Sequence, residues 1–263
     1  MTSSAPSPHM SRTSFSNSSW VSMRLAIRSD IHGNLLALEA VRADLKTRSV
    51  DATINLGDSV TNPLWPRETL ELLDTLNLPT VRGNHDRWIA ERSRTDMTPS
   101  MAFTYESLTS EQRERLGSLP STLQVDADVL AVHGTPEADT EYLLEEAVDG
   151  RLALATAATI DRRLTGRAES LILCGHSHHQ YAAHASSNRL VLNPGSVGCP
   201  RYADDAHPAR REASSPHAKY AIATRRSRGW QVELFALEYD WLAVADQARL
   251  NGRDDWADAF LGS

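Results

Sequence analysis

The sequence predicts an α/β domain in which mixed β-sheets are flanked by helices. Two observations lead to this fold class. In the first half of the chain, short apolar runs alternate with segments of helical periodicity, and polar loops containing glycine separate them. In the last third, several β-like runs follow one another without helices between them. The alternation predicts parallel βα units, and the consecutive strands predict an antiparallel portion added to the sheets.

The first half contains strand–loop–helix units. Three short apolar runs predict strands: 24–28, 52–56 and 80–82. After the first strand, apolar side chains recur at helical spacing: Leu35, Leu38, Val41 and Leu45. Pro66 suits the first position of a second helix, which the following leucines extend to Leu76. The polar segment 86–119 predicts separate helical pieces.

The second half predicts further strands and three helices. The expected strands are 129–132, 171–174, 181–185, 189–192, 220–225 and 230–237. The expected helices are 152–164, 239–250 and 254–261. The polar stretch 203–217 contains two prolines and predicts a flexible loop. We expect one domain over residues 23–263, preceded by a disordered tail at 1–22 that is rich in Ser, Thr and Pro.

The composition narrows the class of protein. The chain has 263 residues, with 27 Lys+Arg against 34 Asp+Glu and a net charge of -7. This acidic balance disfavours stable nucleic-acid binding, which needs surplus Lys and Arg, but it permits a small phosphorylated substrate held by metal. No run reaches the roughly 18 apolar residues of a membrane span, so no membrane partner is expected. Two cysteines imply no disulfide framework and favour the cytoplasm. Nothing in the sequence indicates the oligomeric state.

Polar side chains cluster at the ends of the predicted strands. They are Asp30, His32, Asp58, Asn84, His85, His133, His176 and His178. Because loops at the carboxyl ends of parallel strands converge, we expect these side chains to meet. Oxygen and imidazole donors suit divalent Mn, Fe, Co, Ni or Zn. Seven ligands suffice for two metals about 3.5–4 Å apart, an arrangement that promotes in-line phosphoryl displacement. Asp58, alone at the end of its strand, is the natural bridge.

The order of these motifs resembles that of the calcineurin-like metallophosphoesterases. The motifs are Asp30-Ile31-His32, Gly57-Asp58, Gly83-Asn84-His85-Asp86, His133-Gly134 and Gly175-His176-Ser177-His178. Two longer segments, 29–34 and 193–198, resemble the small prokaryotic phosphodiesterase branch in particular. The resemblance extends from about Met23 to about Leu237. It implies a four-layer αββα sandwich of two mixed β-sheets flanked by helices.

The resemblance also implies roles for individual residues. The first metal would be held by Asp30, His32, Asp58 and His178, and the second by Asp58, Asn84, His133 and His176. His85 would bind no metal and would protonate the leaving group or stabilise charge in the transition state. Manganese is the expected ion, with Fe, Ni, Co or Zn as alternatives.

The implied activity is hydrolysis of a phosphate ester by in-line attack of metal-bound water or hydroxide. A phosphodiester such as a cyclic nucleotide or a dinucleotide is favoured. The alternatives are a phosphomonoesterase, a phosphoprotein phosphatase, or a non-catalytic metal-bound scaffold. The Asp-Arg pair typical of eukaryotic-type Ser/Thr phosphatases is missing after Asp58, and this makes a phosphoprotein phosphatase a weaker alternative without excluding it.

Three further residues are candidates for substrate binding, namely Arg28, Asn34 and Arg201. Arg28 replaces an apolar or small residue of the family, and its charge needs an acid partner, solvent or a substrate phosphate. Arg201 follows a glycine-rich turn and has a planar fork that suits phosphate, although a solvated loop arginine is an equal alternative. Cys199 also follows this turn; we interpret it as inert, with a redox-sensitive thiol as the alternative.

Overall fold

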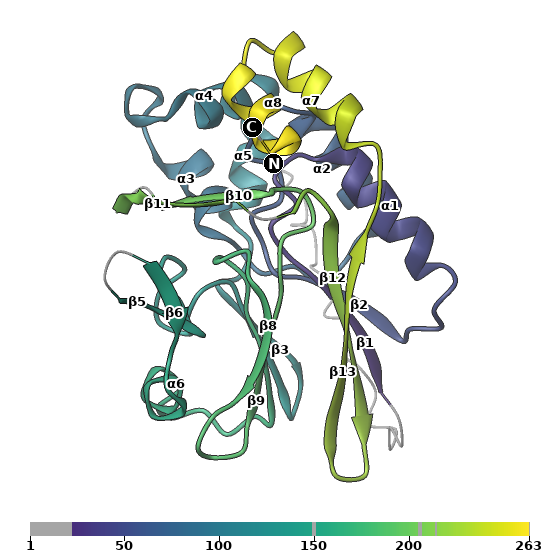
Figure 1. Cartoon of the computed structure of the whole chain (residues 1–263), viewed down its shortest axis with the longest axis vertical. Coiled ribbons are helices and arrows are strands. Elements are labelled where there is room, and N and C mark those ends of the chain that lie inside the picture. The colour runs from purple at the N-terminus through teal and green to yellow at the C-terminus, as the bar shows by residue number, and fades with distance from the viewer. Residues whose placement is uncertain (1–22, 149–150, 205–206, 214, 263) are drawn as a thin grey trace, which may run out of the picture.

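The computed structural model describes residues 23–148, 151–204, 207–213 and 215–262. The expected tail at 1–22 lies outside the described residues. Two β-sheets stacked face to face form the centre of the molecule (Figure 1). The first sheet has the order β13-β12-β1-β2, and the second has the order β3-β4-β7-β9-β8.

Both sheets are mixed. The first contains β1 (Arg24–Arg28), β2 (Ala52–Asn55), β12 (Ala218–Arg226) and β13 (Gly229–Leu237). In it β1 pairs in parallel with β2 and antiparallel with β12. The second contains β3 (Thr122–Asp126), β4 (Val129–Val132), β7 (Leu171–Leu173), β8 (Gln180–His184) and β9 (Leu190–Pro194). Its centre β4-β7-β9 is parallel, and β3 and β8 are antiparallel edge strands.

Alternating side chains divide the core into layers. In β1, Leu25 and Ile27 contact residues of the second sheet in the core between the two sheets, whereas Ala26 lies in a separate cluster with helix α1 (Leu35–Leu45). This is the alternation expected of a strand buried on both faces. On the far face of the second sheet, Ile172 packs with Ile160 of α6 (Ala157–Arg163). The expected four-layer αββα sandwich is therefore confirmed.

The remaining helices cover the first sheet and one end of the sandwich (Figure 1). They are α2 (Pro66–Leu76), α3 (Asn84–Glu91), the 3-10 helix η1 (Arg94–Asp96), α4 (Pro99–Ser107), α5 (Ser110–Gly117), α7 (Trp241–Leu250) and α8 (Asp254–Leu261). Their starts follow from local chemistry. The side chain of Asn34 accepts a hydrogen bond from the backbone N–H of Ala37 and caps α1, and Pro66 occupies the first turn of α2. Among the described residues, none of the helices has the length and apolar character that crossing a membrane requires.

Four elements differ from the sequence expectation, and the first is strand β3 (Thr122–Asp126), which the sequence analysis did not anticipate. The expected helix 152–164 is shorter, because Arg151–Leu154 forms strand β6 and pairs with β5 (Glu145–Val148), and the side chain of Thr156 caps α6. The expected loop 203–217 contains a hairpin of β10 (Arg201–Asp204) and β11 (His207–Ala213). The expected strand 80–82 is reduced to a single bridge between Asn55 and Thr80. Backbone pairing in such short ribbons needs no apolar alternation, so the sequence pattern does not reveal it.

Candidate metal centre

The predicted polar residues meet at one edge of the two sheets. Asp30 and His32 lie in the loop between β1 and α1, and Asp58 follows β2. Asn84 and His85 begin α3, His133 follows β4, and the last two, His176 and His178, follow β7. All seven predicted metal ligands are buried, with 7% or less of each residue exposed. The convergence that parallel strand ends predict is therefore observed.

The backbone of this site is strained. Five predicted ligands have positive φ angles: Asp30, His32, Asp58, His176 and His178. Residues other than glycine rarely adopt this conformation, which costs about 1–3 kcal/mol each. Backbone hydrogen bonds between the first two loops hold it in place, from His32 N–H to Asp58 O (3.0 Å) and from Asp30 N–H to Gly57 O (3.0 Å). The fold thus keeps these side chains turned toward one another at a cost in stability.

A first cluster of donor atoms joins His32, His178 and Asp30. The Nε2 atoms of His32 and His178 lie 3.1 Å apart. The Oδ1 atom of Asp30 lies 3.4 Å from Nε2 of His178 and 3.9 Å from Nε2 of His32. This carboxylate oxygen is buried and has no hydrogen-bond partner. A buried anionic oxygen without a donor is costly, so its position indicates a cation as the missing partner.

A second cluster joins His133, Asn84 and Asp58. Nε2 of His133 lies 3.0 Å from Oδ1 of Asn84 and 3.3 Å from Oδ2 of Asp58. The ring of His176 lies beside that of His133, with centroids 5.3 Å apart. Oδ2 of Asp58 also lies 3.9 Å from Nε2 of His32, so this one oxygen faces both clusters. The other oxygen, Oδ1, accepts a hydrogen bond from the backbone N–H of His85 at 2.9 Å.

Two of the imidazole rings are fixed in the orientation that metal binding requires. Nδ1 of His32 lies 3.0 Å from the carbonyl oxygen of Thr61, and Nδ1 of His133 lies 2.7 Å from that of Leu56. Because a carbonyl can only accept, each Nδ1 carries the hydrogen and donates it. In the neutral ring, Nε2 then keeps its lone pair for a metal.

The donor atoms fit divalent transition metals. With metal–ligand distances of about 2.0–2.2 Å, two ligand atoms on one ion lie about 2.9–3.5 Å apart. The shortest spacings in the two clusters, 3.1 Å between His32 and His178 and 3.0 Å between His133 and Asn84, fall in this range. The donors are carboxylate and amide oxygens and imidazole nitrogens, which suit borderline divalent ions. The residues therefore fit a pair of metal ions.

The charges of the protein's own groups also favour cations. Burial alone would raise the pKa of Asp30, but the neighbouring His178 outweighs it and holds that pKa at about 2. Asp58 is likewise ionised, because His133 and other imidazoles hold its pKa well below the usual value despite burial. Burial would lower the pKa of His133, and the Asp58 carboxylate raises it instead to about 10. A metal would displace that proton and supply the positive charge that the two carboxylates require.

His85 lies beside the first cluster. Its ring centroid is 5.2 Å from that of His32 and 5.1 Å from that of Trp88. Burial lowers the pKa of His85 to about 3 against the opposing effect of the Asp58 carboxylate, and the neighbouring imidazoles lower it further, so the ring is neutral. Its Nδ1 atom has no hydrogen-bond partner. A neutral imidazole next to the metal ligands can donate one N–H to a bound group.

Asp86 is a residue that sequence reasoning did not single out. Its carboxylate accepts three backbone N–H groups, from Asp58 (2.9 Å), Gly83 (3.0 Å) and Ser59 (3.0 Å). These bonds join the loop after β2 to the start of α3. Gly83 is needed where the loops meet, since a Cβ atom there would lie 2.1 Å from Oδ1 of Asp58. In the sequence, the only signal for this role of Asp86 is its position in the motif Gly83-Asn84-His85-Asp86.

The three candidate substrate residues have different environments. The amide of Asn34 donates to the carbonyl of Gly198 and to the hydroxyl of Tyr239, and its oxygen caps α1. Arg28 is buried, and its Nε and Nη2 atoms have no hydrogen-bond partner; burial lowers its pKa to about 9. Arg201 begins β10, and its side chain lies outside what the structure describes. None of the three is yet tested as a substrate contact.

Comparisons with known proteins agree with this geometry. Residues 23–215 match the calcineurin-like phosphoesterase superfamily domain. An uncharacterized protein of Methanocaldococcus jannaschii is 27% identical over 92% of this chain and 99% of its own length. The crystal structure of a metallophosphoesterase from Sphaerobacter thermophilus is 28% identical, has a TM-score of 0.67, and is aligned over 91% of this chain and 99% of its own. A hypothetical protein of Pyrococcus horikoshii shares the fold with a TM-score of 0.71 at 20% identity, over 90% and 97% of the two chains.

The chain belongs to the calcineurin-like phosphoesterase superfamily. The family implies divalent metal ions, and the two clusters of buried donors are where this chain would hold them.

Proposed function

We propose that this protein is a dinuclear-metal phosphoesterase that hydrolyses a small phosphorylated substrate, with a phosphodiester favoured. The observation that carries the proposal is the position of Oδ2 of Asp58, 3.3 Å from His133 Nε2 and 3.9 Å from His32 Nε2. One carboxylate oxygen between two sets of imidazole donors is the arrangement that bridges two ions. We further propose manganese as the usual ion and the cytoplasm as the location.

The proposed ligands form two sets, one for each ion. When bound, the two ions would lower the pKa of water and neutralise charge on the phosphoryl oxygens. Asp30, His32, Asp58 and His178 would hold one ion, and Asp58, Asn84, His133 and His176 the other. The hydrogen bond from the His85 backbone to Oδ1 of Asp58 keeps the bridging oxygen turned toward both clusters.

We propose that His85 acts on the substrate rather than on the metals. Its ring lies against His32 at an interplanar angle of 87°, at the edge of the first cluster. Because the ring is neutral, its N–H can stabilise charge on the phosphoryl group or pass a proton to the leaving oxygen. The ring of Trp88 also contacts that of His85, with centroids 5.1 Å apart.

The test compares Mn²⁺-dependent nitrophenol release from bis-nitrophenyl and mono-nitrophenyl phosphate. The variants are Asp58→Asn and, as matched control, Asp74→Asn, which changes an exposed aspartate of α2. We expect preference for the bis compound, loss of turnover and of bound metal in Asp58→Asn, and wild-type behaviour in the control.

The other outcomes each change the proposal. Preference for the mono compound would identify a phosphomonoesterase or a phosphoprotein phosphatase. Near-normal turnover by an Asp58→Asn protein with both metals bound would refute the bridging role. Two bound metals without release from either compound would favour a non-catalytic scaffold.

A further inference from the structure

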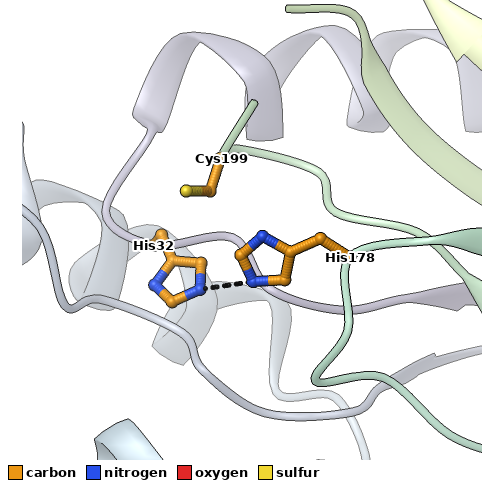
Figure 2. Close-up of side chains that lie close together, drawn as sticks. All are labelled: His32, His178 and Cys199. Atoms are coloured by element: carbon orange, nitrogen blue, oxygen red, sulfur yellow. Dashed lines mark hydrogen bonds between the residues drawn. The ribbon is translucent and has the colours of Figure 1, made fainter. Parts of the chain in front are cut away.

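Cys199 lies beside the first metal cluster. A ring nitrogen of His32, a ring nitrogen of His178 and the Sγ atom of Cys199 all lie within 4.8 Å of one another, and all three residues are buried. Figure 2 shows the thiol next to the pair of imidazoles, whose Nε2 atoms are 3.1 Å apart. Oδ1 of Asp30, buried without a hydrogen-bond partner, faces the same two imidazoles.

The backbone around Cys199 is tied to the loop that carries Asp30. Oγ of Ser196 donates to the carbonyl of Asp30 at 2.7 Å and accepts the backbone N–H of Cys199 at 2.8 Å. The backbone N–H of Gly198 donates to the same carbonyl at 3.1 Å. Gly198 permits this contact, because a Cβ atom there would lie 1.9 Å from the carbonyl oxygen of Ile31. The backbone of Cys199 is therefore held in place relative to the metal ligands.

We propose that Cys199 is a thiolate ligand of the first metal site, which makes that site selective for zinc, iron or cobalt over manganese. This inference rests on the proposed metal centre, adds a fifth donor to its first site, and restricts the manganese proposed above to the second site. On one ion, with bond angles of about 90–120°, a sulfur at about 2.3 Å and a nitrogen at about 2.0–2.1 Å would lie about 3.1–3.8 Å apart. Because the three atoms lie within 4.8 Å of one another, Sγ needs to approach by about 1.7 Å at most, which rotation about the Cα–Cβ bond of Cys199 can supply. On binding, the S–H bond breaks, the sulfur–metal bond forms, and the proton leaves to solvent.

The chemistry separates the two metal sites. Soft thiolate ligands favour zinc and iron, whereas carboxylate and amide oxygens suit manganese. The second cluster contains the amide oxygen of Asn84 together with Asp58 and His133, and no cysteine of the described part of the chain is grouped with it. A thiolate on one side would therefore give a pair of unlike ions.

The decisive experiment measures sulfur at the metal directly. X-ray absorption of zinc-loaded wild-type protein is expected to show a sulfur shell at about 2.3 Å. Cys199→Ser should lose this shell, and Cys174→Ser, which changes the other buried cysteine, should keep it. The cobalt-loaded wild type should show a thiolate-to-metal charge-transfer band in the near ultraviolet. In competition, Cys199→Ser should lower the zinc-to-manganese affinity ratio by about 10-fold or more.

The results separate this inference from the proposed function. Bound zinc without a sulfur shell in the wild type would overturn the role of Cys199 and leave the phosphoesterase proposal standing. A sulfur shell that persists in Cys199→Ser would overturn it as well. A sulfur shell in a protein that releases no nitrophenol would support the Cys199 ligand and refute the proposed activity. Failure of the wild type to bind zinc would overturn the role of Cys199, whereas the proposed function would still be decided by manganese-dependent nitrophenol release.

Discussion

Replacing Asp86 by asparagine should destabilise the fold and open the metal centre. The Asp86 carboxylate is fully buried, and its two oxygens accept three backbone N–H groups. Asparagine keeps the volume but has one oxygen, so at least one N–H would be left facing an amide donor. An unsatisfied buried donor costs about 1–3 kcal/mol, and the other two bonds lose about 1 kcal/mol each without the charge. We therefore expect Asp86→Asn to lower the free energy of unfolding by about 3–5 kcal/mol.

The assay is urea unfolding of the chelator-treated protein, with Asp74→Asn as the exposed control. Burial, reinforced by the charge of Asp58, raises the pKa of Asp86 to about 7, so the measurement belongs at about pH 8.5, where the carboxylate is ionised. Metal content after reloading provides a second readout, because the loop of Asp58 loses its support. If the free energy of unfolding fell by less than about 1 kcal/mol and the metal content stayed full, Asp86 would not be what holds the loop after β2 against the start of α3.

Three further predictions concern residues around the site and the first sheet. His85→Ala should keep both metals and slow nitrophenol release by about 10²-fold; metal loss on elemental analysis would make His85 a ligand instead. Arg28→Met should raise the free energy of unfolding in urea by about 1 kcal/mol or more, because two of its guanidinium nitrogens are buried without hydrogen-bond partners; destabilisation would contradict this. Burial and the hydrogen bond to Asp44 raise the pKa of Tyr220, so the stability this pair gives is present below about pH 10 and lost as the pH rises through that raised pKa. The urea midpoint of Tyr220→Phe should therefore depend less on alkaline pH than that of wild type, and equal slopes would count against the pair.

The sequence carried enough information to predict where the residues of the candidate metal centre meet. Asp30 and Asp58 follow short apolar runs that favour strands, and His133 follows another. Parallel strands fix where such residues go, since their carboxyl ends share one edge. The glycines next to these residues marked the close approach of the loops, which Gly83 and Oδ1 of Asp58 now illustrate.

The supports of the site were harder to foresee. The Asp86 carboxylate accepts hydrogen bonds from backbone N–H groups up to 28 residues away, and the Ser196 hydroxyl donates one to the carbonyl of Asp30, 166 residues away. No periodicity encodes such contacts. The hairpins β5–β6 and β10–β11 were missed for a related reason, because two-stranded ribbons are held by backbone pairing without an apolar face. The burial of Arg28 without an acid partner among the described residues likewise depends on packing that a strand pattern does not contain.

The strained backbone of the candidate metal centre shows why the predicted ligands depend on the supporting residues. Five predicted ligands hold positive φ angles, at a cost of about 1–3 kcal/mol each. Such a cost is sustained only where the surroundings over-determine the conformation. Asp86 does so for the loop of Asp58, and Ser196 with Gly198 does so for the loop of Asp30. The residues that hold the ligands in place are therefore as necessary to the site as the ligands, and Cys199 lies on one of these supports, where a single side chain can change which metal the site prefers.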